Sequence, residues 1–129
     1  MHLSSTIVAS FVAAVSTTGA TVPGTIPTMV VYERTGGFAG VSDRVTVDHT
    51  GTVVTRGGTF ELAPVEVGEL RRALDRITTT ASSAEGCDIP DHFTYTLSYD
   101  GWRATRCHRV PRDWMPAVMR LAALAERPG

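Results

Sequence analysis

The sequence predicts an α+β domain in which an antiparallel β-sheet, made of a meander and a C-terminal hairpin, is packed on one face by two α-helices. Three patterns support this class. Residues 29–62 contain short extended segments separated by turns that contain glycine. Residues 93–108 form two alternating segments around an Asp-Gly pair. Residues 64–78 and 113–127 carry apolar side chains at helical spacing, and 129 residues suffice for a single core.

The predicted meander begins with MVVYER at Met29, a segment rich in the β-branched and aromatic residues that favour strands. In the second segment, DRVTVD, Val45 and Val47 alternate with polar residues, as in a half-buried strand. The segments TVVTR and TFEL follow, and turns at residues 49–51 and 57–58 separate them. This order predicts neighbouring antiparallel strands.

The first predicted helix covers residues 64–78. Pro64 fits the first turn, where its missing N–H is not needed, and Glu66 and Glu69 lie near the positive end of the helix dipole. The apolar stripe of this helix consists of Val67, Leu70, Leu74 and Ile77. Residues 79–91 are small and polar and include glycine and proline, which predicts a loop.

The segment 93–108 gives the most specific structural prediction. FTYTLSY and WRATRCH flank Asp100-Gly101, a preferred pair for a two-residue hairpin turn. This turn predicts the cross-strand pairs Tyr99–Trp102, Leu97–Ala104, Tyr95–Arg106 and Phe93–His108 on one face and Thr94–Cys107 on the other. Because the aromatic face covers the core, Cys107 points away from it. The loop 79–91 can then cross the outer side and bring Cys87 alongside Cys107.

The second predicted helix covers residues 113–127. Asp113 is a suitable N-cap, and Pro116 is tolerated because the first turn lacks intrahelical N–H bonds. Its apolar stripe consists of Trp114, Val118, Leu121, Ala122 and Ala125. The two helices therefore supply the apolar stripes that cover the aromatic face of the sheet.

The N-terminal segment has the composition of a secretory signal peptide. It has no acidic, lysine or arginine side chain, and an apolar centre from Ile7 to Val15 precedes small residues that end at Ala20. We predict a signal peptide over residues 1–20, a flexible lead-in over 21–28 and one domain over 29–127. The protein is then secreted or extracytoplasmic, and the alternative is a cytoplasmic location.

The cysteine count bears on the same question. In an exported protein, the pair Cys87 and Cys107 predicts one disulfide, whereas in a cytosolic protein it predicts two reduced thiols. On the chain-entropy model, closing a loop of this length contributes roughly 3 kcal/mol to stability.

Charge and hydropathy exclude several classes of partner. The net charge is -1, and the 12 basic side chains are arginines scattered along the chain, whereas a nucleic-acid surface needs a basic cluster. No apolar run approaches the roughly 20 residues that span a bilayer. We expect no nucleic-acid or membrane partner, no cofactor, and a monomer when the protein is free.

We find no motif for enzymatic chemistry. The phosphate-binding, dinucleotide-binding, nucleophile-elbow and zinc-protease motifs do not occur. Four residues could be zinc ligands: Cys87, His92, Cys107 and His108. Cys107 and His108, however, are neighbours on a predicted strand and so face opposite sides of the sheet, and no CxxC pair occurs. His49 or His92 could partner an aspartate as a general base, but nearly all of the candidates lie in turn-like segments, where aspartate hydrogen-bonds the local backbone. These candidates are Asp43, Asp48, Asp88, Asp91 and Asp100. We expect neither a metal site nor an enzyme.

The segment ERTGGFAG places glycines on both sides of Phe38. Glycine loosens the backbone, so a large apolar ring here needs an explanation. Either the segment is a turn whose ring folds back to cap the aromatic face, or the ring is held out for a partner.

Two motifs carry a resemblance to a known family. Gly36-Gly37-Phe38-Ala39-Gly40 follows a strand, and Pro90-Asp91-His92-Phe93-Thr94-Tyr95 opens the hairpin, with an ELRRAL helix between them. In this order they resemble the emfourin family over about residues 30–124. Its members are protein inhibitors of protealysin and related thermolysin-like metallopeptidases. The signal peptide and the cysteine pair depart from the type member, which is a cytosolic partner of its protease.

The resemblance implies a non-enzymatic inhibitor that blocks the active-site cleft of such a protease. Thermolysin-like proteases cut before bulky apolar residues, so the Phe38 ring fits the pocket that takes such a side chain. The glycines let the cleft walls approach the backbone closely. The protease-contact candidates are Gly36, Gly37, Phe38, Ala39 and Gly40.

Secondary contact candidates are Asp91, Tyr95 and Arg106. The alternative roles are a turn residue for Asp91 and a core residue for Tyr95. For Arg106 the alternative is a sheet-edge position with its stem on Tyr95 and its head in water. At the level of function, the alternative is a secreted binding or structural module of the same fold without inhibitory activity.

Overall fold

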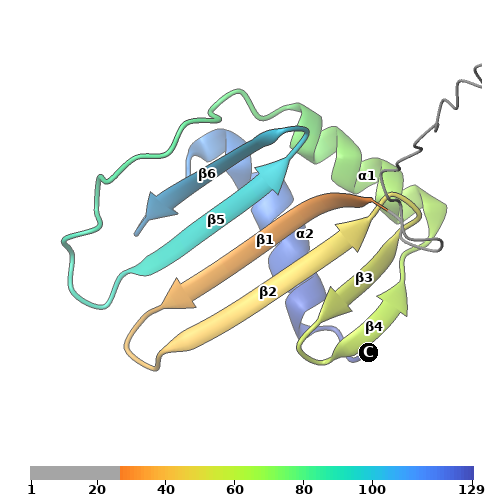
Figure 1. Ribbon diagram of the computed structural model, residues 1–129, viewed down its shortest axis with the longest axis horizontal. Coiled ribbons are helices and arrows are strands. Elements are labelled where there is room, and N and C mark those ends of the chain that lie inside the picture. The colour runs from red at the N-terminus through yellow and green to blue at the C-terminus, as the bar shows by residue number, and fades with distance from the viewer. Residues whose placement is uncertain (1–26) are drawn as a thin grey trace, which may run out of the picture.

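A computed structural model describes residues 27–129 (Figure 1). The strands are β1 (Thr28–Gly36), β2 (Val41–Asp48), β3 (Thr52–Thr55), β4 (Gly58–Glu61), β5 (Phe93–Tyr99) and β6 (Trp102–Cys107). The helices are α1 (Pro64–Asp75) and α2 (Met115–Glu126), and a 3-10 turn, η1 (Arg112–Trp114), precedes α2. The predicted signal peptide and the lead-in up to residue 26 lie outside the described residues. Within residues 27–129, no helix is long and apolar enough to cross a membrane.

The α+β prediction is confirmed. One antiparallel sheet has the strand order β4-β3-β2-β1-β5-β6. In Figure 1, α2 crosses behind this sheet, and α1 lies beside the end of the sheet where the β5–β6 hairpin turns. The two helices also contact each other. The meander and the hairpin therefore form one continuous sheet with one helical layer.

Strand β1 occupies the centre of the sheet, between β2 and β5. It pairs with β2 from Thr28 to Gly36 and with β5 from Val30 to Gly36. Its inward side chains Val30 and Tyr32 are fully buried. Burial raises the pKa of Tyr32 to about 12, so its hydroxyl stays neutral. The N-terminal strand thus joins two halves of the chain that are distant in sequence.

The core lies between the inward face of the sheet and the helices. Fully buried side chains recur at every second position, as in Val30 and Tyr32 of β1 and Val45 and Val47 of β2. The sheet contributes Val30, Tyr32, Val45, Val47, Val53, Leu97 and Ala104, and the helical layer contributes Leu70, Leu74, Trp114, Ala117 and Leu121. Trp114 is the largest of the fully buried side chains.

The hairpin register is confirmed from Tyr99–Trp102 to Thr94–Cys107. The predicted Phe93–His108 pair is not part of the ladder, because β6 ends at Cys107. At His108 the backbone turns into the left-handed region, with φ 68, and its N–H still donates to the Phe93 carbonyl at 2.7 Å.

The prediction that Asp113 caps the second helix is wrong. Its carboxylate instead accepts the backbone N–H groups of Thr78 at 2.8 Å and Thr79 at 2.9 Å, just beyond α1. The indole Nε1 of Trp114 donates to the Thr79 carbonyl at 2.7 Å. The 3-10 turn therefore fastens the start of α2 to the segment after α1, which ends at Asp75 instead of residue 78.

The apolar stripe of α2 also differs from the prediction. Ala117 and Leu124 are buried together with Val118 and Leu121, whereas Ala122 and Ala125 are only half-buried. The predicted stripe began at Trp114, which lies in the 3-10 turn and not in the α-helix.

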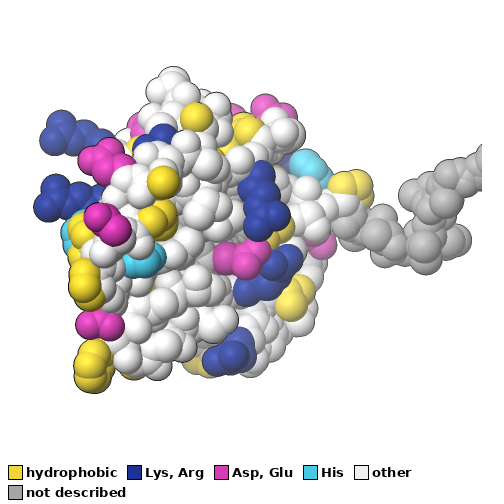
Figure 2. Space-filling model, turned by 60° about the vertical axis from the view of Figure 1, so that its left-hand side comes forward, with side chains coloured by type: hydrophobic (Ala, Val, Ile, Leu, Met, Phe, Trp, Pro, Cys, Tyr) yellow, Lys and Arg dark blue, Asp and Glu magenta, His cyan; other side chains and the backbone are white. Residues whose placement is uncertain are grey.

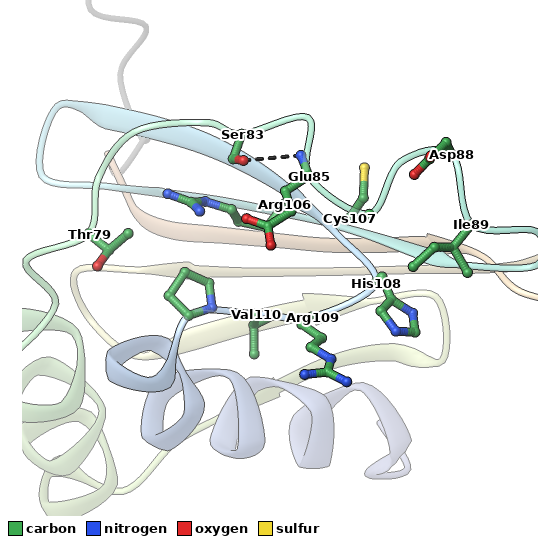
Figure 3. A pocket seen from close by; sticks show the side chains of 12 residues that line it. Thr79, Ser83, Glu85, Asp88, Ile89, Arg106, Cys107, His108, Arg109 and Val110 are labelled. Carbon is green, nitrogen blue, oxygen red and sulfur yellow. Dashed lines mark hydrogen bonds between the residues drawn. The ribbon is translucent and has the colours of Figure 1, made fainter.

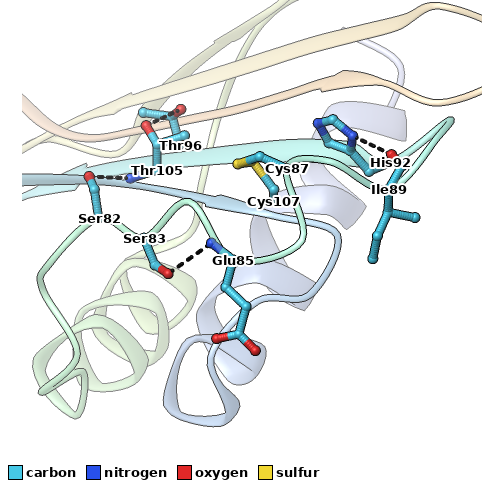
Figure 4. The surroundings of a disulfide bond; sticks show 9 residues. All are labelled: Ser82, Ser83, Glu85, Cys87, Ile89, His92, Thr96, Thr105 and Cys107. Carbon is cyan, nitrogen blue, oxygen red and sulfur yellow. Dashed lines mark hydrogen bonds between the residues drawn. A yellow bond between two sulfur atoms is a disulfide. The ribbon is translucent and has the colours of Figure 1, made fainter.

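The predicted disulfide between Cys87 and Cys107 is present, on the outer side of the hairpin (Figure 4). The loop that carries Cys87 runs along β6, where the N–H of Ser83 donates to the Thr105 carbonyl at 3.1 Å. The N–H of Thr105 donates in turn to Oγ of Ser82 at 2.9 Å. The loop therefore covers backbone groups on the free edge of the sheet, a site where unprotected strands aggregate.

Replacing both Cys87 and Cys107 by alanine should lower the free energy of unfolding by about 3 kcal/mol, because the bridge closes a sequence separation of 20 residues. Urea unfolding of the C87A/C107A variant and the wild type measures this difference. Dithiothreitol should lower the stability of the wild type to a similar extent and leave the variant unaffected. Equal stability of variant and wild type would contradict the prediction.

Asp113 should make stability depend on pH. Its burial opposes ionisation, but the N–H groups of Thr79 and Thr78 outweigh this and lower the pKa of its carboxyl below the ordinary value of 3.8. A lowered folded-state pKa stabilises the protein above that value, and this contribution is lost as the pH falls through the lowered pKa. We expect Asp113→Asn to cost about 1 to 2 kcal/mol at pH 7. Below pH 4 the wild type should lose this advantage over D113N, as thermal unfolding across pH will test.

Candidate functional site

The two motifs that carry the family resemblance meet at one end of the sheet. In the β1–β5 ladder, Gly36 is paired with Phe93. The N–H of Gly37 donates to the His92 carbonyl at 3.0 Å. In Figure 1 this end is at the lower left, where β1 turns into β2 and β5 begins. Two segments that are distant in sequence therefore form one surface, which we call the glycine-turn end.

The connection from β1 to β2 is a tight turn. The N–H of Gly40 donates to the Gly37 carbonyl at 3.2 Å, so Phe38 and Ala39 occupy the tip. The φ angles of Gly36, Gly37 and Gly40 are 105°, 76° and 65°. Residues with a Cβ rarely adopt these angles, which explains the glycines on both sides of the ring.

Phe38 projects from this turn into solvent. Its exposed fraction is 91%, the highest of the large hydrophobic side chains in residues 27–129. The interpretation that this ring caps the aromatic face of the domain is therefore wrong. The ring that occupies that position is Phe93, which packs so closely on Gly37 that a Cβ there would lie 2.7 Å from it.

Arg34 supports the base of the turn, a role that we did not assign from the sequence. Its guanidinium lies 4.8 Å from the centre of the Phe93 ring and its Nη2 lies 2.8 Å from the Asp43 carboxylate. Its Nε is buried without a hydrogen-bond partner in the described part of the chain. The available signal was the spacing: Arg34 follows Tyr32 by two residues and so faces the core.

The three secondary contact candidates lie in different surroundings. Asp91 is exposed in a turn, with φ 57, next to His92. Tyr95 is half-buried against the core, with its ring 6.2 Å from that of Phe93. Arg106 is opposite Tyr95 as predicted, but its head is not free in water. Its Nε and Nη2 donate to the Ala81 carbonyl at 3.0 and 2.7 Å, which fastens the loop.

A cavity of about 600 Å³ lies beside the disulfide, between the loop and the segment after β6 (Figure 3). Glu85 and Asp88 line its loop side, and Arg106, His108 and Arg109 line the other. None of these side chains forms an ion pair within residues 27–129, and no nucleophile here is hydrogen-bonded to a base.

Two of the four potential zinc ligands form the disulfide. The disulfide commits both Cys87 and Cys107, so neither can act as a thiolate ligand. Within residues 27–129, no three His, Cys, Asp or Glu side chains are grouped closely enough to hold a metal ion.

Charges of both signs occur together on the side of the molecule that carries the loop. Figure 2 turns this side forward, with basic and acidic groups gathered near the two margins and a largely uncharged centre between them. This view therefore has no extended patch of one sign.

Comparisons with protein-family models, curated proteins and solved structures find no match. The class that the fold defines is thus an α+β domain with a disulfide, and its most conspicuous surface feature is an aromatic ring on a glycine turn.

Replacing Gly36 by alanine should destabilise the domain by more than about 2 kcal/mol, because its Cβ would lie 2.5 Å from the His92 carbonyl oxygen at φ 105. Gly40→Ala is the matched control, since its Cβ meets no atom within 4 Å. It should cost only the backbone term of about 1 kcal/mol. Chemical unfolding compares the variants, and equal costs would contradict this account of the turn.

Proposed function

We propose that the chain is a non-enzymatic inhibitor of a thermolysin-like metallopeptidase of the protealysin type, and that Phe38 enters the active-site cleft. The resemblance to the emfourin family gives the class of partner. The observation that carries the proposal is the meeting of the two motifs: the N–H of Gly37 donates a hydrogen bond to the His92 carbonyl, and the ring of Phe38 between the glycines is exposed.

The exposure of Phe38 supports a contact role. An aromatic side chain gains roughly 1.5 to 3 kcal/mol when it moves from water into an apolar pocket. At 91% exposure, almost none of this gain is realised within the domain itself. Buried aromatic side chains are also frequent hot spots of protein interfaces. A protease pocket for bulky apolar side chains is a suitable acceptor for this ring.

The turn is ordered before any partner binds. Its ends belong to β1 and β2, and the N–H of Gly37 is held by His92. A preorganised turn avoids the entropy cost of ordering a loop on binding. The Gly37 carbonyl also accepts a hydrogen bond from the N–H of Gly40 within the turn, so the Gly37–Phe38 peptide is not in the extended form of a strand. This geometry favours an inhibitor over a substrate.

We propose export together with inhibition. A disulfide persists in oxidising compartments and is rare in cytosolic proteins, so the Cys87–Cys107 bridge is compatible with a secreted or extracytoplasmic protein. The second candidate is a secreted binding or structural module without inhibitory activity. The cavity beside the disulfide supports this alternative, because its volume is in the range of small-molecule sites.

The purified protein should inhibit protealysin or thermolysin, and Phe38→Ala should raise the inhibition constant at least about 30-fold. Peptide hydrolysis is measured at increasing inhibitor concentration. The variant should fold normally, because the ring makes few contacts within the domain. Met119→Ala, at an exposed apolar position on α2, should leave inhibition unchanged.

Two results would go against the proposal. If both proteases stay fully active at saturating wild-type protein, the inhibitor function is wrong and the binding or structural module remains. If the wild type inhibits and F38A inhibits equally, Phe38 is not the contact residue.

A further inference from the structure

Phe38 alone is too small to hold a stable protein complex. An aromatic side chain buries about 150 to 250 Å². A standard interface buries about 800 Å² on each partner. If the proposed function is correct, most of the interface must come from surface that adjoins the glycine turn.

Two segments flank the glycine turn along the sheet, and the strand register separates them. On the β2 side, β3 pairs only with Thr46 and Val47, several residues behind the turn. At about 3.3 Å per residue, the β3–β4 turn is set back from Phe38. On the β1 side, β5 begins at Phe93, level with Gly36. The neighbour of Phe38 is therefore the loop that leads into β5.

This loop, residues 86–92, is fastened on both sides. The disulfide ties it to β6 at Cys87, and the His92 carbonyl accepts the N–H of Gly37. Inside the loop, the N–H of Ile89 donates to the Gly86 carbonyl at 3.2 Å. The Ile89 carbonyl accepts the N–H of His92 at 3.3 Å and lies 2.7 Å from Nδ1 of the same side chain. Few conformations remain to be lost on binding.

Part of the loop surface is free to make contacts. Residues 88–91 are all exposed, and the large apolar side chain among them is Ile89, which is 37% exposed and also lines the cavity beside the disulfide. In the sequence, Asp88 precedes Ile89 and Asp91 follows it. Neither carboxylate forms a hydrogen bond or ion pair with the rest of residues 27–129. An apolar side chain between unpaired charges has the composition of an interface, whose apolar centre is surrounded by a polar rim.

We propose that the disulfide-closed loop 86–92 is a second contact segment of the inhibitor, which places Ile89 on an apolar surface of the metallopeptidase beside the pocket for Phe38. Asp88 and Asp91 lie at the rim of this contact and attract basic side chains of the protease. The disulfide and the Gly37–His92 bond hold the two contact segments in one relative position. This inference rests on the proposed function and extends it from one residue to a two-segment surface.

The test compares Ile89→Arg with Val54→Arg in the inhibition of protealysin and thermolysin. Val54 is the matched control, because it is an exposed β-branched residue, at 48%, on β3. I89R should raise the inhibition constant at least about tenfold, and V54R should leave it within about twofold. Circular dichroism and thermal unfolding check that both variants are folded.

The rim charges are tested by the D88N/D91N variant, in which asparagine also tolerates the positive φ of Asp91. Charges at the rim act mainly on the association rate, so this variant should bind more slowly and with a weaker dependence on salt. The D88N/D91N variant also tests whether the loop contacts the protease if I89R does not fold. Association kinetics at low and high salt measure both quantities.

The outcomes separate the two proposals. Weakened inhibition by I89R, with V54R unchanged and slower association of D88N/D91N, supports the second contact segment. Inhibition by I89R and D88N/D91N equal to that of the wild type, while F38A is impaired, overturns the second segment and leaves the proposed function intact. Absence of inhibition by the wild type overturns both.

Discussion

The pairing of β1 with β5 is the contact on which the rest of the structure depends. It runs from Val30–Tyr99 to Gly36–Phe93 and joins the N-terminal meander to the C-terminal hairpin. Without it, each half would leave an open edge and an uncovered apolar face. The same ladder buries Tyr32 between two strands and places the glycine turn beside the start of β5. The core and the candidate site are therefore consequences of one strand pairing.

The long loop after α1 has several structural tasks that its polar composition does not reveal. Near α1, Thr78 and Thr79 are hydrogen-bonded to Asp113. Further along, Ala81 is hydrogen-bonded to Arg106 and Ser83 to β6, and Cys87 forms the disulfide. These contacts protect a sheet edge and order the segment next to Phe38. A loop with so many fixed points is suited to present side chains, because little entropy is lost when a partner binds.

Local patterns predicted those parts of the site that depend on neighbouring residues. The Asp100-Gly101 turn fixed the hairpin register, and from that register the outward position of Cys107 followed. The exposure of Phe38 was left open, because no local rule decides whether a ring on a glycine turn folds inward. The spacing of Arg34 from Tyr32 indicated its inward position, but its partner Phe93 is distant in sequence and so was missed. Asp113 was misassigned because its partner Thr78 is also distant in sequence.

The sequence by itself determined the α+β class and the hairpin register from Tyr99–Trp102 to Thr94–Cys107, since periodicity and turn chemistry act over a few residues. Only the tertiary structure decided the central place of β1, the meeting of Gly37 with His92, and the exposure of Phe38. These features depend on how separate segments pack together. Packing follows from the shape and burial of the whole core, which no short stretch of sequence contains.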